Sequence, residues 1–281
     1  MSESLTTVAP PSFGGTQITQ VRRLALRPRF EIERPRLAVP QGFGAGGVRV
    51  VALAAPAGYG KSTIAARWRE QLLEAGVTCC WVGLQPKHRD AKSLLVDLIG
   101  QIQRQLDGIE LPTAQRMLKA ATSTTVEPVL AGVIGDLEQN AQRFVLVLDD
   151  LEQLQDSAGE VLVQSLVTYR PDCMDLLLCS RLTSKFSLNR ERVAGRLADL
   201  RAADLAFSPS EVRHFLEAYL GTPPSDDVVD ALSSKSEGWP AAVGLFAQVA
   251  ERHGATQAMA QDVTLRLHQF LPAQANVPKY V

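Results

Sequence analysis

Residues 54–63 read AAPAGYGKST, and this stretch decides the fold. The apolar run VRVVALAAP leads into it and the amphipathic run KSTIAARWREQLLEAG leads out of it, so we expect a buried strand, a tight turn and a helix. In such a turn, successive backbone N–H groups form a concave nest at the helix N-terminus and can bind phosphate oxygens. The residues expected to hold the phosphates are Ala57, Gly58, Tyr59, Gly60, Lys61, Ser62 and Thr63.

The usual phosphate-binding loop (P-loop) pattern begins with glycine, whereas this chain has Ala55 in that place. Glycine is required only where φ is positive or where a Cβ atom would collide with a phosphate. We expect those places to be Gly58 and Gly60, and we expect Ala55 to lie at the exit of the strand with ordinary β dihedrals. The substitution weakens the match in sequence but leaves the binding mechanism intact. The alternative is a plain strand-to-helix turn that contains these residues by chance.

A nucleoside triphosphate also needs a cation site. We expect Lys61 to pair with the β- and γ-phosphates and the Ser62 hydroxyl to bind magnesium, which takes oxygen ligands. The run FVLVLDD (residues 144–150) ends in two acids, and parallel strands bring their carboxyl ends to one edge of a sheet. On a strand neighbouring the loop, Asp149 would reach the magnesium and Asp150 would orient or activate the attacking water. The alternative is that both acids are only turn or capping residues.

Arg181 ends the next apolar run, LLLCSR, at the same predicted edge. Its guanidinium keeps its charge at any working pH and would sense or neutralise the γ-phosphate. The alternative is a surface ion pair. Further cations follow in a predicted loop and are interpreted as solvated: Lys185, Arg190, Arg192 and Arg196.

From Val48 onward, nearly continuous apolar runs alternate with helical patterns. Strands that are apolar on both sides are buried on both faces, which is typical of a parallel sheet with right-handed crossovers. We therefore predict an α/β fold over residues 22–207. Its expected architecture is a P-loop NTPase three-layer sandwich with a parallel sheet of about five strands.

The pattern changes at Ser208, where a serine N-cap, a proline at the first helical position and Glu211 three residues after the cap predict a helix. The sequence that follows is helical in pattern, so we predict a small all-α domain over residues 208–253. Residues 1–21 are predicted to be a disordered leader, because Ser, Thr, Pro and Gly bury too little apolar surface. Residues 254–281 are predicted to be a tail or the start of a truncated next domain.

The composition is that of an ordinary globular protein, with 46% hydrophobic and 21% charged residues and a net charge of −1. This balance gives no general attraction to nucleic acid or to an anionic membrane. The four cysteines lack CxxC spacing and are predicted to be reduced core thiols, with Cys79 and Cys80 on opposite faces of a strand. The histidines form no zinc-binding pattern. With no signal-peptide pattern and no apolar run of about 18 residues, we expect a cytoplasmic protein without membrane contact.

Four motifs occur in order along the chain: APAGYGKST, VLVLDD, LLLCSR and SEGWPAAVGL, preceded by RPRL at residues 34–37. Over about residues 22–253 they resemble the ATPase region of the large ATP-binding LuxR-type transcriptional regulators, which belong to the signal-transduction (STAND) ATPases. The resemblance implies an AAA-like switch rather than a metabolic enzyme. In such a switch ADP is bound at rest, ATP with an inducer drives self-association, and slow hydrolysis resets the state.

The resemblance also implies that residues 238–240 fold over the nucleotide, with Pro240 near the base or sugar, and that Arg34 is a contact near the base. A plain helix start is the alternative explanation for Pro240. The relatives are several times longer and carry a winged-helix unit, an inducer-sensing superhelical region and a C-terminal helix-turn-helix. This chain ends before those regions, so we expect an excised fragment or a truncated relative that does not itself bind DNA.

Two other kinds of function use the same loop. One is a stand-alone P-loop ATPase or small-molecule kinase, for which the predicted loop at residues 185–196 would be an arginine-rich lid. The other is a replication or plasmid-partition ATPase that binds partners. Turnover separates these functions, because a switch retains its nucleotide and hydrolyses it slowly, whereas a kinase consumes ATP quickly once its acceptor is present.

Overall fold

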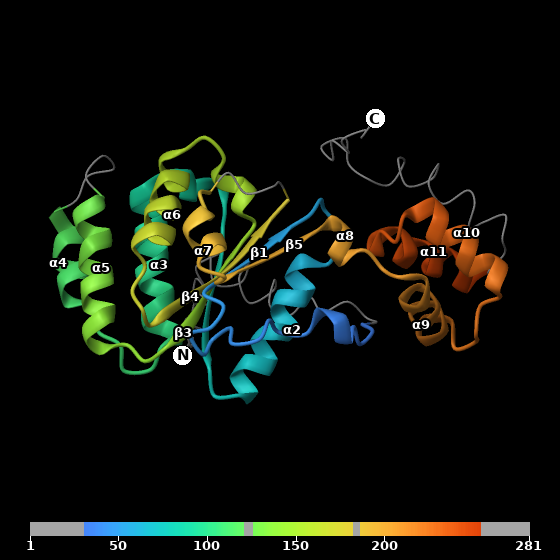
Figure 1. Cartoon of the computed structure of the whole chain (residues 1–281). Coiled ribbons are helices and arrows are strands. Elements are labelled where there is room, and N and C mark those ends of the chain that lie inside the picture. Colours follow the sequence, from blue (N-terminus) through green and yellow to red (C-terminus); the bar gives the residue numbers. More distant parts are fainter. Residues whose placement is uncertain (1–30, 121–125, 182–185, 254–281) are drawn as a thin grey trace, which may run out of the picture.

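The computed structural model describes residues 31–120, 126–181 and 186–253, so the predicted leader and the predicted C-terminal tail lie outside the described residues. In this part of the chain, an α/β unit and a smaller helical unit lie side by side (Figure 1). The strands are β1 (Val50–Ala54), β2 (Thr78–Gly83), β3 (Phe144–Asp149), β4 (Met174–Ser180) and β5 (Leu197–Arg201). The α-helices are α2 (Lys61–Glu74), α3 (Ala91–Gln105), α4 (Pro112–Ala120), α5 (Glu127–Asn140), α6 (Ala158–Tyr169), α7 (Asn189–Val193), α8 (Ala202–Leu205), α9 (Pro209–Leu220), α10 (Asp226–Ser236) and α11 (Pro240–His253). The short 3-10 helices are η1 (Pro35–Leu37), η2 (Pro86–Arg89) and η3 (Leu151–Leu154).

The strands form one five-stranded parallel sheet in the order β2-β3-β4-β1-β5. This confirms the predicted α/β fold. One detail is corrected: the strand that ends in Asp149 is not the neighbour of β1, because β4 pairs with both β1 and β3 and lies between them. Apolar runs indicate which residues form strands, but strand order is set by tertiary packing, which leaves no local signal. In a parallel sheet all carboxyl ends still reach the same edge, so Asp149 keeps its predicted place.

Helices cover both faces of the sheet, which gives the predicted three-layer sandwich (Figure 1). One core lies between the sheet and α3, α5 and α6, and the other lies between the sheet and α2, around the fully buried Trp68. Cys80 belongs to the first core and Cys79 to the second, which confirms that their side chains point to opposite faces. All four cysteines are free, and burial raises the pKa of Cys79 to about 11 and that of Cys80 to about 12. Both thiols therefore stay protonated and unreactive near neutral pH.

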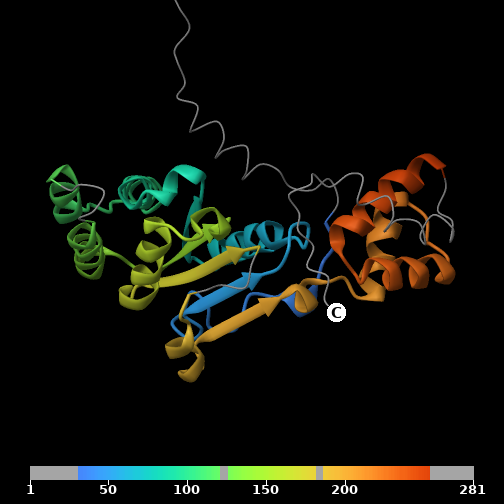
Figure 2. The same cartoon turned by 90° about the horizontal axis from the view of Figure 1, so that it is seen from above.

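The helical unit has its own core, formed by α9, α10 and α11, and lies beyond the carboxyl ends of the strands (Figure 2). Its first helix begins as predicted. The Ser208 Oγ accepts a hydrogen bond from the Glu211 N–H, and the Glu211 carboxylate accepts one from the Ser208 N–H at 2.9 Å. Ser225 is the N-cap residue of α10. The unit therefore faces the sheet edge where the two acids were expected.

Two segments differ from the predicted pattern. The last of the apolar runs in the α/β pattern, LADLRAADLAF (residues 197–207), forms a strand only at its start, because the Arg201 N–H donates to the Asp204 carboxylate at 2.8 Å and this contact starts α8. The predicted loop at residues 185–196 contains the helix α7, which ends just before Gly195, a residue with φ of +66°. In both places a capping residue begins or ends a short helix, although the composition of the sequence does not change there.

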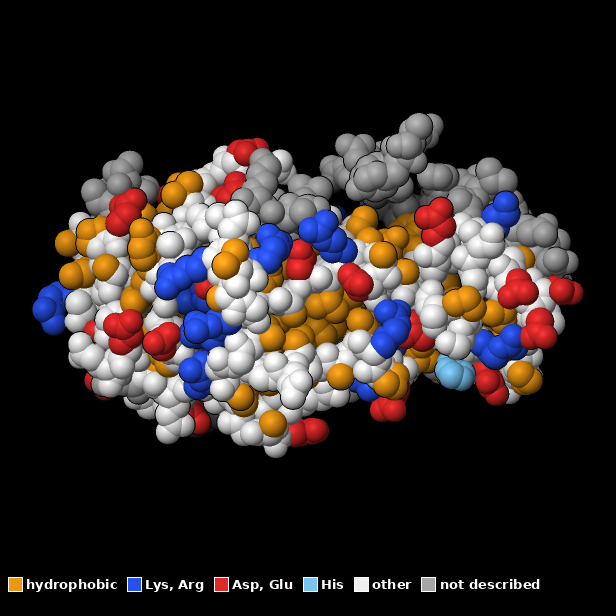
Figure 3. Space-filling model, viewed as in Figure 1, with side chains coloured by type: hydrophobic (Ala, Val, Ile, Leu, Met, Phe, Trp, Pro, Cys, Tyr) orange, Lys and Arg blue, Asp and Glu red, His pale blue; other side chains and the backbone are white. Residues whose placement is uncertain are grey.

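The surface is mixed in charge. On the face shown in Figure 3, side chains of both signs are interspersed over the two units, in line with the net charge of −1. Within the described ranges, every helix is too short or too polar to cross a membrane.

Candidate functional site

The loop between β1 and α2 has the backbone that phosphate binding requires. Gly58 and Gly60 have φ of +82° and +78°, in the left-handed region that favours glycine. Gly60 is the N-cap residue of α2, so the free N–H groups that begin this helix face the loop. Ala55 is buried directly after β1, and it is not among the described non-glycine residues that have positive φ. The positive φ predicted for both glycines is therefore confirmed, and Ala55 lies at the exit of the strand, as expected.

The ammonium group of Lys61 folds back over the loop that precedes it. Its Nζ donates to the carbonyl oxygens of Ala55 at 2.7 Å and Pro56 at 3.0 Å. Burial lowers the pKa of Lys61, and the negative charge of Glu152 opposes this effect. A partly desolvated cation that has neutral carbonyl partners is a strong anion site, because a bound anion compensates for the lost solvation.

Ser62, at the start of α2, and Asp149, at the end of β3, meet across the intervening strand. The Ser62 hydroxyl donates to Asp149 Oδ1 at 3.2 Å. A hydroxyl and a carboxylate so close together can share one hard cation, and Mg²⁺ needs only one or two such protein oxygens when phosphates supply the others. The residues present therefore fit a nucleotide-bound magnesium ion. They do not form a self-sufficient metal cage, since the described residues contain no cluster of three His, Cys, Asp or Glu side chains.

Asp150 follows in an unusual backbone conformation. Its φ of 63° and ψ of 43° lie in the left-handed region, and its N–H donates to Asp149 Oδ1 at 3.0 Å. Such a conformation is uncommon outside glycine, although aspartate tolerates it better than most residues. Left-handed non-glycine residues cluster at functional sites, where the surrounding structure holds them in place.

Arg181 lies at the carboxyl end of β4, next to the acids, and it has an ion-pair partner that the sequence analysis missed. Its Nε binds Glu152 Oε1 at 2.8 Å, and its backbone N–H donates to Glu152 Oε2 at 3.0 Å. The ion pair that was the alternative interpretation is thus present. About half of the Arg181 side chain remains exposed, at 52%, so the guanidinium is not enclosed. Glu152 follows Asp149 by three residues in the sequence. Its role as the partner of Arg181 becomes apparent only when β3 and β4 are known to be neighbouring strands.

Arg34 makes most of its polar contacts with residues of α8 and α9 and the segment between them. Its guanidinium binds both oxygens of Glu211 at 3.1 Å and donates to the carbonyls of Leu205 and Ala206 at 3.0 and 2.8 Å. It also lies over the Phe207 ring, 4.8 Å from the centroid. Most of its hydrogen-bonding capacity is therefore used to join the segment before β1 to the helical unit.

Arg36 reinforces this junction, with Nε and Nη2 at 3.0 and 2.8 Å from the two oxygens of Glu211. Although burial raises the pKa of Glu211, hydrogen bonds from Arg36 and Arg34 outweigh this effect and lower it to about 2. We call this contact of Arg34 and Arg36 with Glu211 the arginine clamp.

The arginine clamp gives a testable pH dependence. Glu211→Gln keeps the side-chain shape and the capping acceptor but removes the charge, so we expect it to cost about 1.5–3 kcal/mol of unfolding free energy at pH 7. Because the pKa of Glu211 is depressed in the folded protein, this difference should be complete above about pH 4.5 and shrink as pH falls toward 2. Melting temperatures of parent and variant across this range measure it. Glu217→Gln, the same change at an exposed position on α9, should have little effect at any pH; equal effects of both variants would contradict the clamp.

A cavity of about 690 Å³ lies between the loop, the segment before β1 and the helical unit. Six of the predicted nucleotide-binding residues line it: Arg34, Gly58, Tyr59, Gly60, Thr63 and Pro240. Lys61, Ser62, Asp149, Asp150 and Arg181 are not part of its lining. The arrangement thus has two parts, a polar corner at the strand ends and an adjoining cavity of a size typical for small-molecule ligands.

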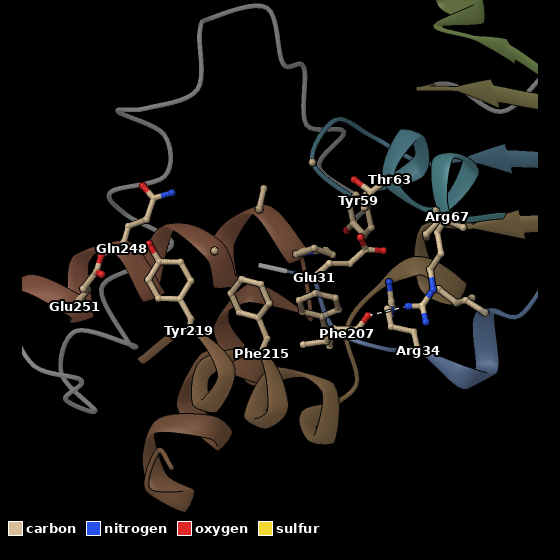
Figure 4. Close-up of a pocket in the computed structure, with 18 of the residues that line it drawn as sticks. Glu31, Arg34, Tyr59, Thr63, Arg67, Phe207, Phe215, Tyr219, Gln248 and Glu251 are labelled. Carbon is tan, nitrogen blue, oxygen red and sulfur yellow. Dashed lines mark hydrogen bonds between the residues drawn. The ribbon is translucent and has the colours of Figure 1, made fainter. Parts of the chain in front are cut away.

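Aromatic side chains form the far wall of this cavity. Figure 4 shows Phe207, Phe215 and Tyr219 in a row on the helical unit, with Tyr59 and Thr63 on the side of the loop. The ring centroids in the row are 5.7 and 6.1 Å apart. Apolar and aromatic walls suit the flat faces of a base. This row was not predicted from the sequence, although Phe215 and Tyr219 are four residues apart on a predicted helix and so share a face.

A parallel α/β sheet, a glycine loop that opens a helix, and a serine that contacts an acid at a nearby strand end define a P-loop ATPase. Residues 38–179, about half of the chain, match the family of AAA ATPase domains. The chain belongs to this family.

Curated relatives agree with that assignment. The chain is 29% identical over 231 residues to the serine/threonine-protein kinase PknK of Mycobacterium tuberculosis. The matched region covers 79% of this chain and 20% of PknK. It is 24% identical over 213 residues to the HTH-type transcriptional regulator MalT of Klebsiella pneumoniae, and this matched region covers 76% of this chain and 23% of MalT. The chain thus spans about a fifth of the length of these relatives. Among solved structures, the Aeropyrum pernix ORC1 protein in complex with DNA is similar at a TM-score of 0.45 and 16% identity, over 92% of this chain and 66% of that one.

Proposed function

We propose that this chain is the ATP-binding, slowly hydrolysing switch module of a LuxR-type transcriptional regulator. The observation that carries the proposal is the shared cavity: residues of the P-loop, such as Tyr59 and Thr63, and residues of the helical unit, such as Phe207 and Pro240, line the same space. A ligand that fills this space contacts both units at once. A change in the bound ligand, such as ATP for ADP, therefore changes the contacts that hold the two units together. Such a difference between ligands is the physical requirement for a switch.

The proposed roles follow from the contacts of each side chain. Lys61 exchanges its carbonyl partners for the β- and γ-phosphate oxygens, and Ser62 and Asp149 hold Mg²⁺. When bound, the magnesium ion neutralises charge on the phosphates. Asp150 accepts the proton of the attacking water. Arg181 contacts the γ-phosphate, which means that its guanidinium turns away from Glu152.

Pro240 and the aromatic row contact the base in this proposal, and Arg34 holds the base-binding wall in place through Glu211. The relatives support a module that serves different proteins, because one is named as a protein kinase and another as a transcriptional regulator while each matches more than three quarters of this chain. A domain that reports nucleotide state can serve either output. Self-association in response to ATP is proposed for a full-length regulator that contains such a module, and direct DNA binding is not proposed for this chain.

The test compares how long the protein retains bound nucleotide with how fast it hydrolyses ATP. The protein is loaded with radiolabelled ATP and Mg²⁺, passed through a desalting column, and followed for release of ADP and phosphate. A switch should retain nucleotide and turn over far more slowly than the roughly 10 s⁻¹ typical of enzymes. Rapid multiple turnover, alone or with an added acceptor, would instead indicate a stand-alone ATPase or a small-molecule kinase.

A further inference from the structure

The helical unit makes two hydrogen bonds directly to the backbone of the P-loop. The indole Nε1 of Trp239 donates to the carbonyl oxygen of Ala57 at 3.0 Å. The N–H of Ala241, in the first turn of α11, donates to the carbonyl oxygen of Gly58 at 3.1 Å. Two consecutive carbonyls of the loop thus accept hydrogen bonds from residues at the start of α11, more than 180 residues away in the sequence.

These two bonds also fix the direction of two N–H groups. In a planar trans peptide, the carbonyl of one residue and the N–H of the next point in opposite directions. The peptide that carries the Ala57 carbonyl also carries the Gly58 N–H, and the peptide that carries the Gly58 carbonyl also carries the Tyr59 N–H. Holding both carbonyls toward the helical unit therefore holds both N–H groups toward the opposite side, where the nest for phosphate lies.

The contact is closely fitted as well as hydrogen-bonded. The Tyr59 and Trp239 rings stack, with centroids 6.5 Å apart and an interplanar angle of 27°. A Cβ atom on Gly58 would lie 2.6 Å from both Trp239 Nε1 and Ala241 Cβ. Glycine at this position is therefore required for the approach of α11 in addition to its positive φ.

The turn before α11 is equally constrained. Gly238 has φ of +71°, and a Cβ atom there would lie 2.2 Å from the carbonyl oxygen of Phe207. The Gly238 carbonyl in turn accepts a hydrogen bond from the Phe207 N–H at 2.7 Å. Trp239 is thus presented to the loop from a fixed turn, which lowers the conformational entropy lost when its indole binds.

We propose that Trp239 is a positioning residue for nucleotide binding, which pre-orients the Gly58 and Tyr59 N–H groups of the P-loop through its bond to the Ala57 carbonyl. The inference rests on the proposed function, because it concerns the same site. Since the oriented groups face phosphates common to ADP and ATP, Trp239 strengthens the binding of both. By thermodynamic linkage, either nucleotide strengthens the docking of Trp239 on the loop to the same degree.

The first test is Trp239→Phe, which keeps a ring to stack on Tyr59 and removes the N–H donor. Loss of one hydrogen bond should raise the dissociation constants of ADP and ATP about three- to tenfold, measured by calorimetric titration in the presence of Mg²⁺. The matched control is Trp81→Phe, the same change on β2 in the other unit, which should leave both constants unchanged. Trp239 is only half-buried, so the apo variant should melt close to the parent.

A spectroscopic readout tests the linkage without altering Trp239. The chain has three tryptophans, and Trp68 is fully buried, so in the Trp81→Phe protein the tryptophan open to acrylamide is Trp239. ADP or ATP should reduce the quenching of its fluorescence, and Lys61→Ala in the same background should abolish this response. If the parent binds nucleotide but Trp239→Phe binds as tightly, or quenching is unchanged by nucleotide, the inference is overturned. If the parent binds no nucleotide, it is the proposed function that fails.

Discussion

Lys61→Ala should abolish the stabilisation of this protein by ATP. For the parent, Mg²⁺-ATP at a hundredfold excess over its dissociation constant should add about 2.7 kcal/mol to the free energy of unfolding, which raises the melting temperature by a few degrees. The variant lacks the only loop side chain that brings a full positive charge to the phosphates, so no shift is expected at the same ATP concentration. Differential scanning fluorimetry with and without ATP measures both shifts.

The variant should remain folded without nucleotide, because the hydrogen bonds of the Lys61 ammonium within the described residues go to two neighbouring carbonyls, those of Ala55 and Pro56. Lys119→Ala is the matched control, since Lys119 is exposed on α4, away from the loop. It should respond to ATP like the parent. An undiminished ATP shift in Lys61→Ala would show that the polyphosphate binds elsewhere.

Asp150→Asn should separate binding from hydrolysis. Asparagine is nearly the same shape and also tolerates the left-handed backbone found at this position, so the turn after β3 should survive. The amide cannot accept a proton from water, and loss of a general base typically slows a reaction by a factor of about 100 to 10,000. Single-turnover hydrolysis should fall by that factor, while the dissociation constant of ATP stays within about twofold of the parent value.

Asp156 offers a close control, because it is another aspartate with positive φ, at 54°, and it is exposed. Asp156→Asn should hydrolyse ATP at the parent rate. Loss of ATP binding in Asp150→Asn, with hydrolysis unchanged per bound nucleotide, would mean that the roles of Asp149 and Asp150 are assigned the wrong way round.

The features that could be predicted from the sequence are those encoded by neighbouring residues. Positive φ at Gly58 and Gly60 follows from the turn between a strand and a helix, and the start of α9 follows from the capping residues around Ser208. The opposite faces of Cys79 and Cys80 follow from strand geometry alone. Each of these depends on fewer than about ten residues, so one sequence carries the whole signal.

What could not be predicted depends on contacts between distant segments. The place of β4 between β1 and β3, the ion pair of Glu152 with Arg181, and the use of Arg34 to bind Glu211 all join residues that have no common local pattern. Arg34 illustrates the difficulty. The resemblance implied a contact near the base, and Arg34 does line the cavity, but its bidentate partner Glu211 lies on α9, 177 residues away, and no local pattern joins the two.

The arginine clamp limits how the two units can separate. It joins the N-terminal segment to α9 at a place distinct from the bonds that Trp239 and Ala241 make to the loop. If the loop bonds break while the clamp holds, the helical unit stays tethered and swings about a fixed edge. The covalent connection between α8 and α9 alone would leave the helical unit free to take many orientations, whereas the clamp restricts them. An open form that keeps the clamp would therefore hold Trp239 near the loop, which raises its effective concentration for reclosure.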